Sequence, residues 1–323
     1  MIHLVVPGLL GAFPRFAEGG PVPPLPALER LFARADRQPG PDSFPQAMFQ
    51  LFGVATEEPL PTAAVSFHAD SLGVSDSRYM LHADPVYLRP DQDRLLAFDF
   101  HHQPLQRDAP RPFVEAFNSH FCTDGLELLA PHPTRWYLAV EQRPDVQFHH
   151  LSYVVGRNID HFLPEGAEAG TWRAWMNEVQ MLFHGLPENA GREAAGLFAV
   201  NGLWFSGGGF LPDGVAGGSV DPAAISMGGG LSSDNPLAAG LARLARAPGS
   251  DALRIEQAPG RAVLDGDREA WLEAVKTLDI ELAELMGEDL CLYLCDGSRL
   301  RWSPGMRRRW WRRRRRLEPE RAE

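Results

Sequence analysis

The sequence predicts an α/β protein, with a mostly parallel sheet flanked by helices and a smaller inserted α+β unit. Apolar, β-compatible runs such as His3–Val6 and Leu197–Phe205 are typical of strands buried on both faces of a parallel sheet. Segments with helical periodicity lie between such strands. Residues 78–165 differ, because hairpin signals replace this alternation. A chain of 323 residues is long enough for one elaborate domain or two modest ones.

The first 77 residues predict one strand and several helices. His3–Val6 is the expected strand, and Pro7–Gly11 is the loop that follows it. Apolar residues recur at helical spacing after this loop, and prolines and glycines separate the segments. Helices are expected over Pro23–Asp36, Gln46–Phe52 and Pro61–Ala69.

Residues 78–165 predict the inserted α+β unit. Residues 79–88 and 94–98 resemble the two arms of a hairpin whose turn lies at Arg89–Asp93. A helix and two further strands should follow, at Pro112–Phe121, Leu126–Leu129 and Trp136–Val140. We therefore expect residues 1–77 and 166–305 to form the core and residues 78–165 to form a cap.

The stretch from Asn177 to Gly209 carries the strongest signals. A helix with apolar residues at three- and four-residue spacing ends at Pro187, and a short helix through Arg192 can follow. The apolar run Leu197–Phe205 then predicts a buried strand, with Gly207–Gly209 at its carboxyl end. Ligands bind at that edge in open α/β sheets, and glycines allow the backbone to approach an anion closely.

The remainder of the chain returns to alternating helices and strands. Short strands are expected at Ala224–Met227, Arg254–Gln257 and Ala262–Leu264, and helices at Leu237–Ala245 and Glu269–Met286. A closing hairpin is expected from Leu290–Leu294 and Arg299–Trp302.

Composition indicates a reduced, cytoplasmic protein. The hydrophobic fraction is 44% and the charged fraction 23%, as in ordinary globular proteins, and no run of eighteen apolar residues is present. The start of the chain lacks the basic region and cleavage site of a signal peptide. The three cysteines, Cys122, Cys291 and Cys295, do not have the spacing of a zinc or redox pair.

Charge is distributed unevenly along the chain. Residues 307–316 read RRRWWRRRRR; removing these eight positive charges from the net charge of −11 leaves −19 on the other residues. We expect residues 306–323 to form a basic Arg/Trp tail that could bind an acidic partner, such as phosphates, nucleic acid or an anionic membrane surface. The alternative is a terminal helix whose Trp310 and Trp311 dock on the body while its arginines pair with local carboxylates.

The candidate site is placed in the central stretch. His184 and Glu178 are the candidate proton-transfer residues, because helical spacing brings them near other polar side chains. Arg192 is the expected anion partner, since a guanidinium offers a planar fork of donors. The expected ligand-binding residues are Asn177, Asn189, Arg192, Asn201, Trp204, Gly207, Gly208 and Gly209.

Other histidines give weaker signals. His82 and Asp84 would share one face of a strand, but a single pair of this kind is more often structural than metal-binding. The adjacent pairs His101–His102 and His149–His150 would point to opposite faces of a strand, so neither pair should chelate a metal easily.

The central stretch resembles a known family. The run from Asn189 through Arg192, Asn201 and Trp204 to Gly209 is similar to a segment of archaeal-type cofactor-independent phosphoglycerate mutases, members of the alkaline phosphatase superfamily. This resemblance implies an alkaline-phosphatase-like core. The ADPVYLR, NEVQMLFH and LWFSGGG segments also resemble a bacterial group named for the Rpf-cluster regulatory protein RpfE.

The chain departs from the family where the family holds two metal ions. Its members place a metal-binding Asp directly after the first strand, where Pro7–Gly11 has no carboxylate, and Asp265-Gly-Asp267 lacks the family's histidine. No histidine follows His184. The position of the family's nucleophilic serine falls near Phe44, beside Ser43.

Two functions therefore remain open. The first is a regulatory or ligand-binding protein on a phosphoglycerate-mutase-like scaffold, without metal or cofactor, that binds a phosphorylated or other anionic small molecule. The alternative is an active enzyme for phosphoryl transfer or sugar phosphates, a mutase or hydrolase with a rebuilt site.

Overall fold

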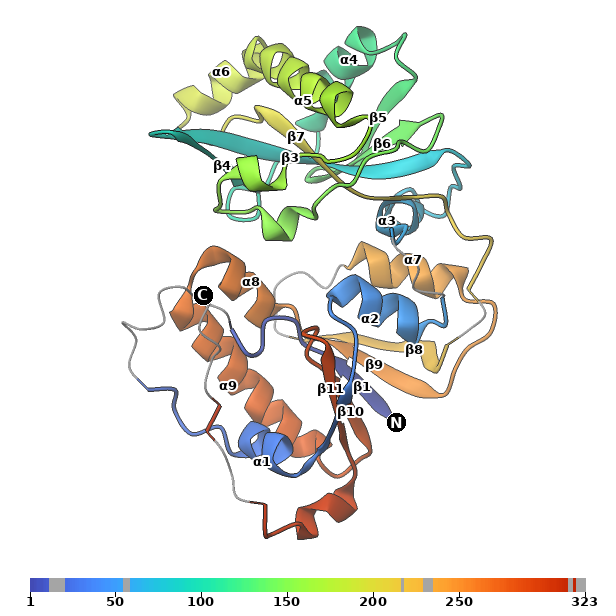
Figure 1. Cartoon of the computed structure of the whole chain (residues 1–323), viewed down its shortest axis with the longest axis vertical. Helices are drawn as coiled ribbons and strands as arrows, with labels where there is room; N and C mark the ends of the chain where they lie inside the picture. Colours follow the sequence, from blue (N-terminus) through green and yellow to red (C-terminus); the bar gives the residue numbers. More distant parts are fainter. Residues whose placement is uncertain (12–20, 55–58, 216–217, 229–234, 313–315, 318–323) are drawn as a thin grey trace. The chain divides into compact units, whose positions relative to one another are not determined.

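The computed structural model describes residues 1–11, 21–54, 59–215, 218–228, 235–312 and 316–317. The chain divides into two compact units, the first made of Met1–Thr56 with Gly214–Glu323 and the second of Glu57–Asp213. Both units are drawn in Figure 1. Among the described residues, no helix is long and apolar enough to cross a bilayer.

The first unit is built on a mostly parallel sheet. Its strands follow the order β2-β11-β10-β1-β9-β8. The pairs β10–β1, β1–β9 and β9–β8 are parallel, whereas β11 and β2 are added antiparallel at one edge. The strands are β1 (Ile2–Val5), β2 (Asp36–Pro39), β8 (Val220–Met227), β9 (Asp251–Ile255), β10 (Leu290–Tyr293) and β11 (Ser298–Trp302).

Helices supply the other half of the first core. Trp271, Val275, Leu278 and Leu282 recur at helical spacing along α9 and are buried against β1 and β10. The indole of Trp271 donates to the carbonyl oxygen of Gly8 at 3.0 Å, which fixes the loop after β1. The helices of this unit are α1 (Pro26–Arg34), α2 (Phe44–Leu51), α7 (Pro236–Leu244), α8 (Ala258–Asp265), α9 (Arg268–Leu285) and the 3-10 helix η4 (Pro304–Arg308).

The second unit is built around one long strand, β3 (Tyr79–Asp91). It pairs antiparallel with β4 (Arg94–Phe98), β6 (Arg135–Val140) and β7 (Gly202–Gly209), and β6 pairs with β5 (Leu126–His132). The middle of β3 therefore has neighbours on both sides, which explains why residues around Leu81 are completely buried.

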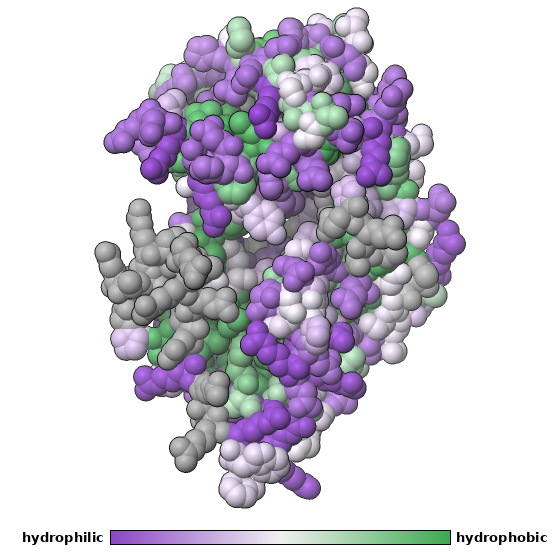
Figure 2. Space-filling model, in the orientation of Figure 1, coloured by the Kyte–Doolittle hydropathy of each residue, from purple (hydrophilic) through white to green (hydrophobic). Residues whose placement is uncertain are grey.

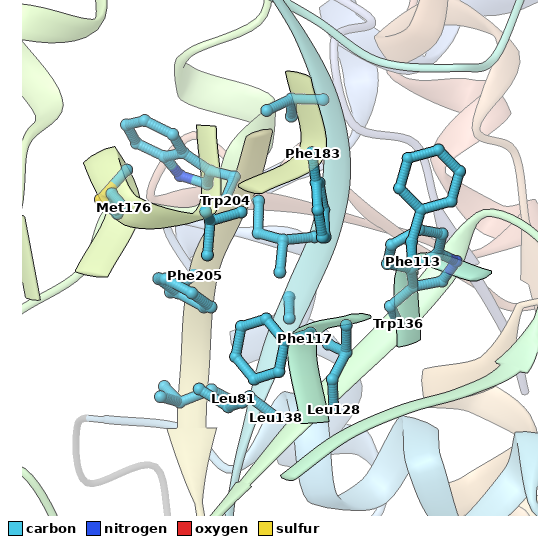
Figure 3. Packing of buried hydrophobic residues seen from close by; sticks show 14 of the residues in the cluster. Leu81, Phe113, Phe117, Leu128, Trp136, Leu138, Met176, Phe183, Trp204 and Phe205 are labelled. Atoms are coloured by element: carbon cyan, nitrogen blue, oxygen red, sulfur yellow. The ribbon is translucent and has the colours of Figure 1, made fainter. Parts of the chain in front are cut away.

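Helices cover both faces of this second sheet (Figure 1). On one face, α4 (Pro110–His120) and α5 (Ala169–His184) contribute a large aromatic core that includes Phe113, Phe117 and Phe183 (Figure 3). On the other face, α3 (Thr62–Asp70) packs Ala63 and Phe67 against Met80 and Tyr137. The remaining helices are α6 (Pro187–Ala194), η2 (Leu151–Tyr153) and η3 (Ile159–Phe162).

The predicted fold class is confirmed, while several elements differ. The second unit is wider than the predicted cap at residues 78–165, because β7 pairs with β3 and brings α5 and α6 with it. Residues 202–209 therefore form an antiparallel strand paired with β3, and not a strand of the parallel sheet. The predicted strand Ala262–Leu264 is wrong, since these residues lie inside α8.

Candidate functional site

A group of polar side chains lies on the α3-facing side of the second sheet. His82 and Asp84 are two residues apart on β3 and therefore point to the same face. The strand pairing places Ser206 of β7 and Tyr137 of β6 on either side of His82. The register thus brings together side chains from three strands that are distant in sequence.

The hydroxyl of Ser206 is buried without a partner. This residue has 0% exposure, and its Oγ makes no hydrogen bond within the part of the chain that the structure describes. Burying an unsatisfied hydroxyl costs roughly 1–3 kcal/mol by mutational measures. A buried polar group of this kind is often explained by a role in binding, because a ligand can supply the missing bond.

His82 lies between two other rings. Its ring centroid is 5.4 Å from that of Tyr137 and 6.3 Å from that of His150. Burial, reinforced by His150, lowers the pKa of His82 to about 3. The imidazole is therefore neutral at physiological pH and presents one donor and one acceptor.

Asp84 has the opposite perturbation. Burial and the negative charge of Asp99 raise the pKa of Asp84 to about 7. This carboxyl group therefore exchanges its proton near neutral pH and can either donate or accept a hydrogen bond. Perturbed groups gathered in one place are a recognised indication of a functional site.

Asp70 at the end of α3 fixes one wall of this group. Its carboxylate accepts hydrogen bonds from Nε and Nη2 of Arg135 at 2.8 and 2.7 Å, and from the hydroxyl of Tyr137 at 2.7 Å. Burial raises the pKa of Tyr137 well above its ordinary value, so the phenol remains a donor to Asp70. The ring beside His82 is held rigidly.

His150 is a second ring beside His82. Its Nδ1 accepts the backbone N–H of Ser152 at 3.2 Å and thereby caps η2. Burial lowers the pKa of His150, so the ring is neutral at physiological pH, and its proton lies on Nε2 when Nδ1 accepts.

The residues that the sequence predicted for proton transfer lie elsewhere. Glu178, His184 and Asn177 are exposed on α5, on the opposite side of the sheet from His82. Glu178 lies 3.3 Å from Nε2 of His120, also at the surface. The structure does not bring these three residues together with the glycines of β7.

Asn189 serves as a buried connection between α6 and the chain leading into β7. Its amide donates to the carbonyl oxygens of Phe183 and Val200, both at 2.8 Å, and its Oδ1 accepts the N–H of Val200 at 2.8 Å. Asn201 similarly exchanges two hydrogen bonds with the backbone of Leu88, at 2.6 and 2.9 Å. Both amides are occupied by backbone groups.

Trp204 is also engaged internally. Its ring is buried, with 1% exposure, and its indole N–H donates to the carbonyl oxygen of His149 at 2.8 Å. This bond holds the segment before η2 against β7, and so positions His150 beside His82.

Arg192 behaves differently from its neighbours. Its Nε donates to the carbonyl oxygen of Phe198 at 2.7 Å, and its guanidinium lies over the ring of Phe100 at 5.3 Å. Among the described residues its Nη2 has no hydrogen-bond partner and the guanidinium forms no ion pair with a carboxylate, and burial lowers the pKa of Arg192.

The three glycines are required by close packing. A β-bulge lies here, since two residues of β7 oppose one residue of β3, and Gly207 has φ +61°. A Cβ on Gly207 would lie 2.0 Å from Oγ1 of Thr62 and 2.9 Å from Cδ2 of His82. Cβ atoms on Gly208 and Gly209 would meet the Tyr79 hydroxyl at 2.5 Å and the Cβ of Pro61 at 2.4 Å.

The sequence pattern did not single out His82, Asp84 and Ser206 as the candidate site. His82 and Asp84 gave a visible signal through their alternation on a strand, whereas Ser206 inside an apolar run gave none. The described residues contain no group of three or more His, Cys, Asp or Glu side chains that could hold a metal ion.

Comparisons with known proteins identify similar solved structures at low sequence identity. No protein-family model matches the chain, and no curated protein matches its sequence. Among solved structures, a cofactor-independent phosphoglycerate mutase from Thermoplasma acidophilum DSM 1728 is similar at 11% identity and a TM-score of 0.38, covering 94% of this chain and 90% of that one. The PH0037 protein from Pyrococcus horikoshii gives 13% identity and a TM-score of 0.45, covering 98% and 91%.

Proposed function

We propose that the protein is a ligand-binding or regulatory protein, whose site is the face formed by His82, Asp84 and Ser206. The observation that carries this proposal is the Ser206 hydroxyl, which is buried without a partner opposite a neutral imidazole. A ligand that enters this face can satisfy it. The phosphoglycerate-mutase-like scaffold suggested by the sequence is compatible with this role.

Binding explains these side chains better than nucleophilic catalysis does. A serine nucleophile needs a base within hydrogen-bond distance, and the base needs an orienting carboxylate. The Ser206 hydroxyl has no such bond, although His82 is its cross-strand neighbour. The groups therefore act as independent donors and acceptors toward a ligand.

The chemistry of the face selects the ligand class. Ser206 and neutral His82 suit hydroxyl groups, while Asp84 in its protonated form can donate to a carboxylate or phosphate oxygen. Above a pH of about 7, the ionised Asp84 repels an anion. We infer a small hydroxylated acid that binds more tightly at pH 6 than at pH 8.

Calorimetric titration with 3-phosphoglycerate tests the proposal. We expect measurable binding at pH 6, weaker binding at pH 8, and a loss of roughly tenfold in Ser206→Ala, the worth of about one hydrogen bond. Ser71, the partly exposed residue that follows α3, provides the matched control Ser71→Ala. Equal affinity in both serine variants, or no binding at either pH, would contradict the proposal.

A second candidate rests on Arg192, whose half-buried guanidinium has no carboxylate partner. An unpaired guanidinium suits phosphate, and this feature favours the alternative of an enzyme directed at sugar phosphates. Titrations with inorganic phosphate and with glycerate separate the two. Phosphate alone should bind if Arg192 is the principal site, and glycerate should bind if the His82 face is.

A further inference from the structure

The Arg/Trp segment, residues 307–312, is the most unusual surface of the first unit. It begins at the end of η4 and reads RRRWWR. In Figure 2, purple and pale residues cover the part of the molecule where η4 lies in Figure 1. This surface is therefore charged and polar, and the tryptophans are its large apolar component.

The segment is fixed to the body by its own arginines. Arg309 donates from Nη2 to Oδ2 of Asp36 at 3.1 Å and from Nη1 to the carbonyl oxygen of Arg34 at 2.9 Å. Arg312 donates to the carbonyl oxygen of Ala35 at 3.2 Å. These bonds satisfy the last carbonyl groups of α1, where cations also interact favourably with the helix dipole.

Apolar contacts hold the segment at both ends. Met306 packs against the first core, and Leu317 is buried in it. The predicted free tail at 306–323 is therefore, in its described part, a segment attached to the body before and after the tryptophans. Of the described residues between these contacts, Arg307, Arg308, Trp310, Trp311 and Arg312 are exposed.

The two tryptophans are not docked on the body. Trp310 is 78% exposed and Trp311 is 63% exposed, whereas five of the other six tryptophans are buried. Arg307 and Arg308 are also exposed, and neither side chain has a hydrogen bond or ion pair within the described residues. The expected docking of the tryptophans is therefore wrong, whereas the expected pairing of arginines with a local carboxylate is found at Asp36.

We propose that this segment binds the surface of an anionic lipid membrane. Indole rings favour the membrane–water interface, and adjacent arginines are attracted to acidic headgroups. Outside residues 307–316 the chain carries a net charge of −19, because these residues supply eight positive charges and the whole chain carries −11. Such a body repels an anionic surface, so contact is directed to this segment alone.

The ring geometry favours a membrane over single-stranded nucleic acid. Successive bases stack parallel to one another on aromatic side chains. The rings of Trp310 and Trp311 are 6.1 Å apart and inclined at 82°, so they cannot offer two parallel platforms in this arrangement. Insertion into the headgroup region requires no parallel alignment.

Vesicle flotation tests the proposal with the full chain. We expect binding to vesicles of phosphatidylcholine with phosphatidylserine, no binding to phosphatidylcholine alone, and weaker binding at high salt. Trp310→Ala/Trp311→Ala and Arg307→Gln/Arg308→Gln should each weaken binding roughly tenfold or more. A blue shift of tryptophan fluorescence should accompany binding of the wild type and should be absent from the Trp310→Ala/Trp311→Ala variant.

Matched controls use exposed residues of the second unit. Arg107→Gln/Arg157→Gln removes the same charge, and Tyr153→Ala removes an exposed aromatic ring. Both should bind vesicles like the wild type. Equal losses in control and test variants, absence of vesicle binding, or binding to a single-stranded oligonucleotide in preference to vesicles would overturn the proposal.

Discussion

Ser206 and His82 lie opposite each other on adjacent antiparallel strands, yet the serine hydroxyl is buried without a hydrogen bond. The imidazole is kept neutral by burial, which lowers its pKa to about 3. The hydroxyl and the imidazole could form a hydrogen bond with each other, but within the described residues they do not. This relationship is the basis of the proposed ligand site.

Removing the Ser206 hydroxyl should not weaken the free protein. Ser206→Ala eliminates a buried group without a partner, so we expect an unfolding free energy that is unchanged or higher by about 1 kcal/mol. Thr62 provides the control, since its buried hydroxyl donates to the carbonyl oxygen of Gly207 at 3.3 Å. Thr62→Ala should lose about 1 kcal/mol. Urea unfolding of both variants checks this, and an equal loss would show that Ser206 has a partner.

The raised pKa of Asp84 predicts a specific pH dependence. The folded state binds this proton up to a pH of about 7, whereas an unfolded aspartate releases it near pH 3.9. The wild-type unfolding free energy therefore falls as pH rises between about 4 and 7. Asp84→Asn should gain stability relative to the wild type over this window. A constant difference between pH 5 and pH 8 would contradict the assignment.

His82 should show the opposite sign. Its pKa is about 3 in the folded state and near 6.5 when unfolded, so the unfolded state binds more protons between these values. The wild type therefore loses stability as pH falls from about 6.5 toward 3. His82→Gln should be increasingly stable relative to the wild type in acid. Thermal melts at pH 7 and pH 5 measure the stability difference between His82→Gln and the wild type. A difference that does not increase at pH 5 would contradict the lowered pKa of His82.

Gly207 should not tolerate a side chain. Its φ of +61° and the approach of Thr62 leave no room for a Cβ, so Gly207→Ala should cost roughly 2–4 kcal/mol through backbone strain and overpacking. Gly191 in α6 has open space around it, and Gly191→Ala should stabilise by about 0.5–1 kcal/mol. Denaturant unfolding measures the stability of the two variants. A Gly207→Ala variant as stable as the wild type would show that the bulge does not require glycine.

Arg192 should affect anion binding more than Asn189 does. Arg192→Ala should weaken phosphate binding by about 1.5–3 kcal/mol if the guanidinium holds an anion. It should also lose about 1 kcal/mol of stability, because its bond to Phe198 disappears. Asn189→Ala removes three backbone hydrogen bonds and should destabilise by about 2 kcal/mol or more without changing phosphate affinity. Calorimetry measures the phosphate affinity of both variants, and thermal melts measure their stability. Unaltered phosphate affinity in Arg192→Ala would show that Arg192 does not bind the anion.

Local sequence patterns predicted most of the elements. The spacing of Trp172, Val179 and Phe183 identified α5, and the turn at Arg89–Asp93 identified the β3–β4 hairpin, because both depend on neighbouring residues. The pairing of β7 could not be predicted in this way. An apolar run is expected both for a parallel strand and for an antiparallel strand covered on two faces.

The candidate site depended on register and packing that no local pattern reveals. Ser206 and His82 meet only because β7 pairs with β3 in one alignment. The run Gly207–Gly209 was predicted to be an anion-binding turn. A bulge that packs closely on Thr62 and Pro61 requires glycines as well, so the sequence does not distinguish the two. Asn189 and Asn201 were predicted to contact a ligand because they are polar residues near an apolar strand. The sequence does not show that their side chains already hydrogen-bond to backbone groups.

The most direct measurement of the central claim is a crystal structure soaked with 3-phosphoglycerate at pH 6. The account predicts ligand density with an oxygen about 2.5–3.0 Å from Oγ of Ser206 and within hydrogen-bond distance of His82 or Asp84. Density confined to Arg192, or a pair of metal ions roughly 3.5–4 Å apart held by side chains, would contradict it.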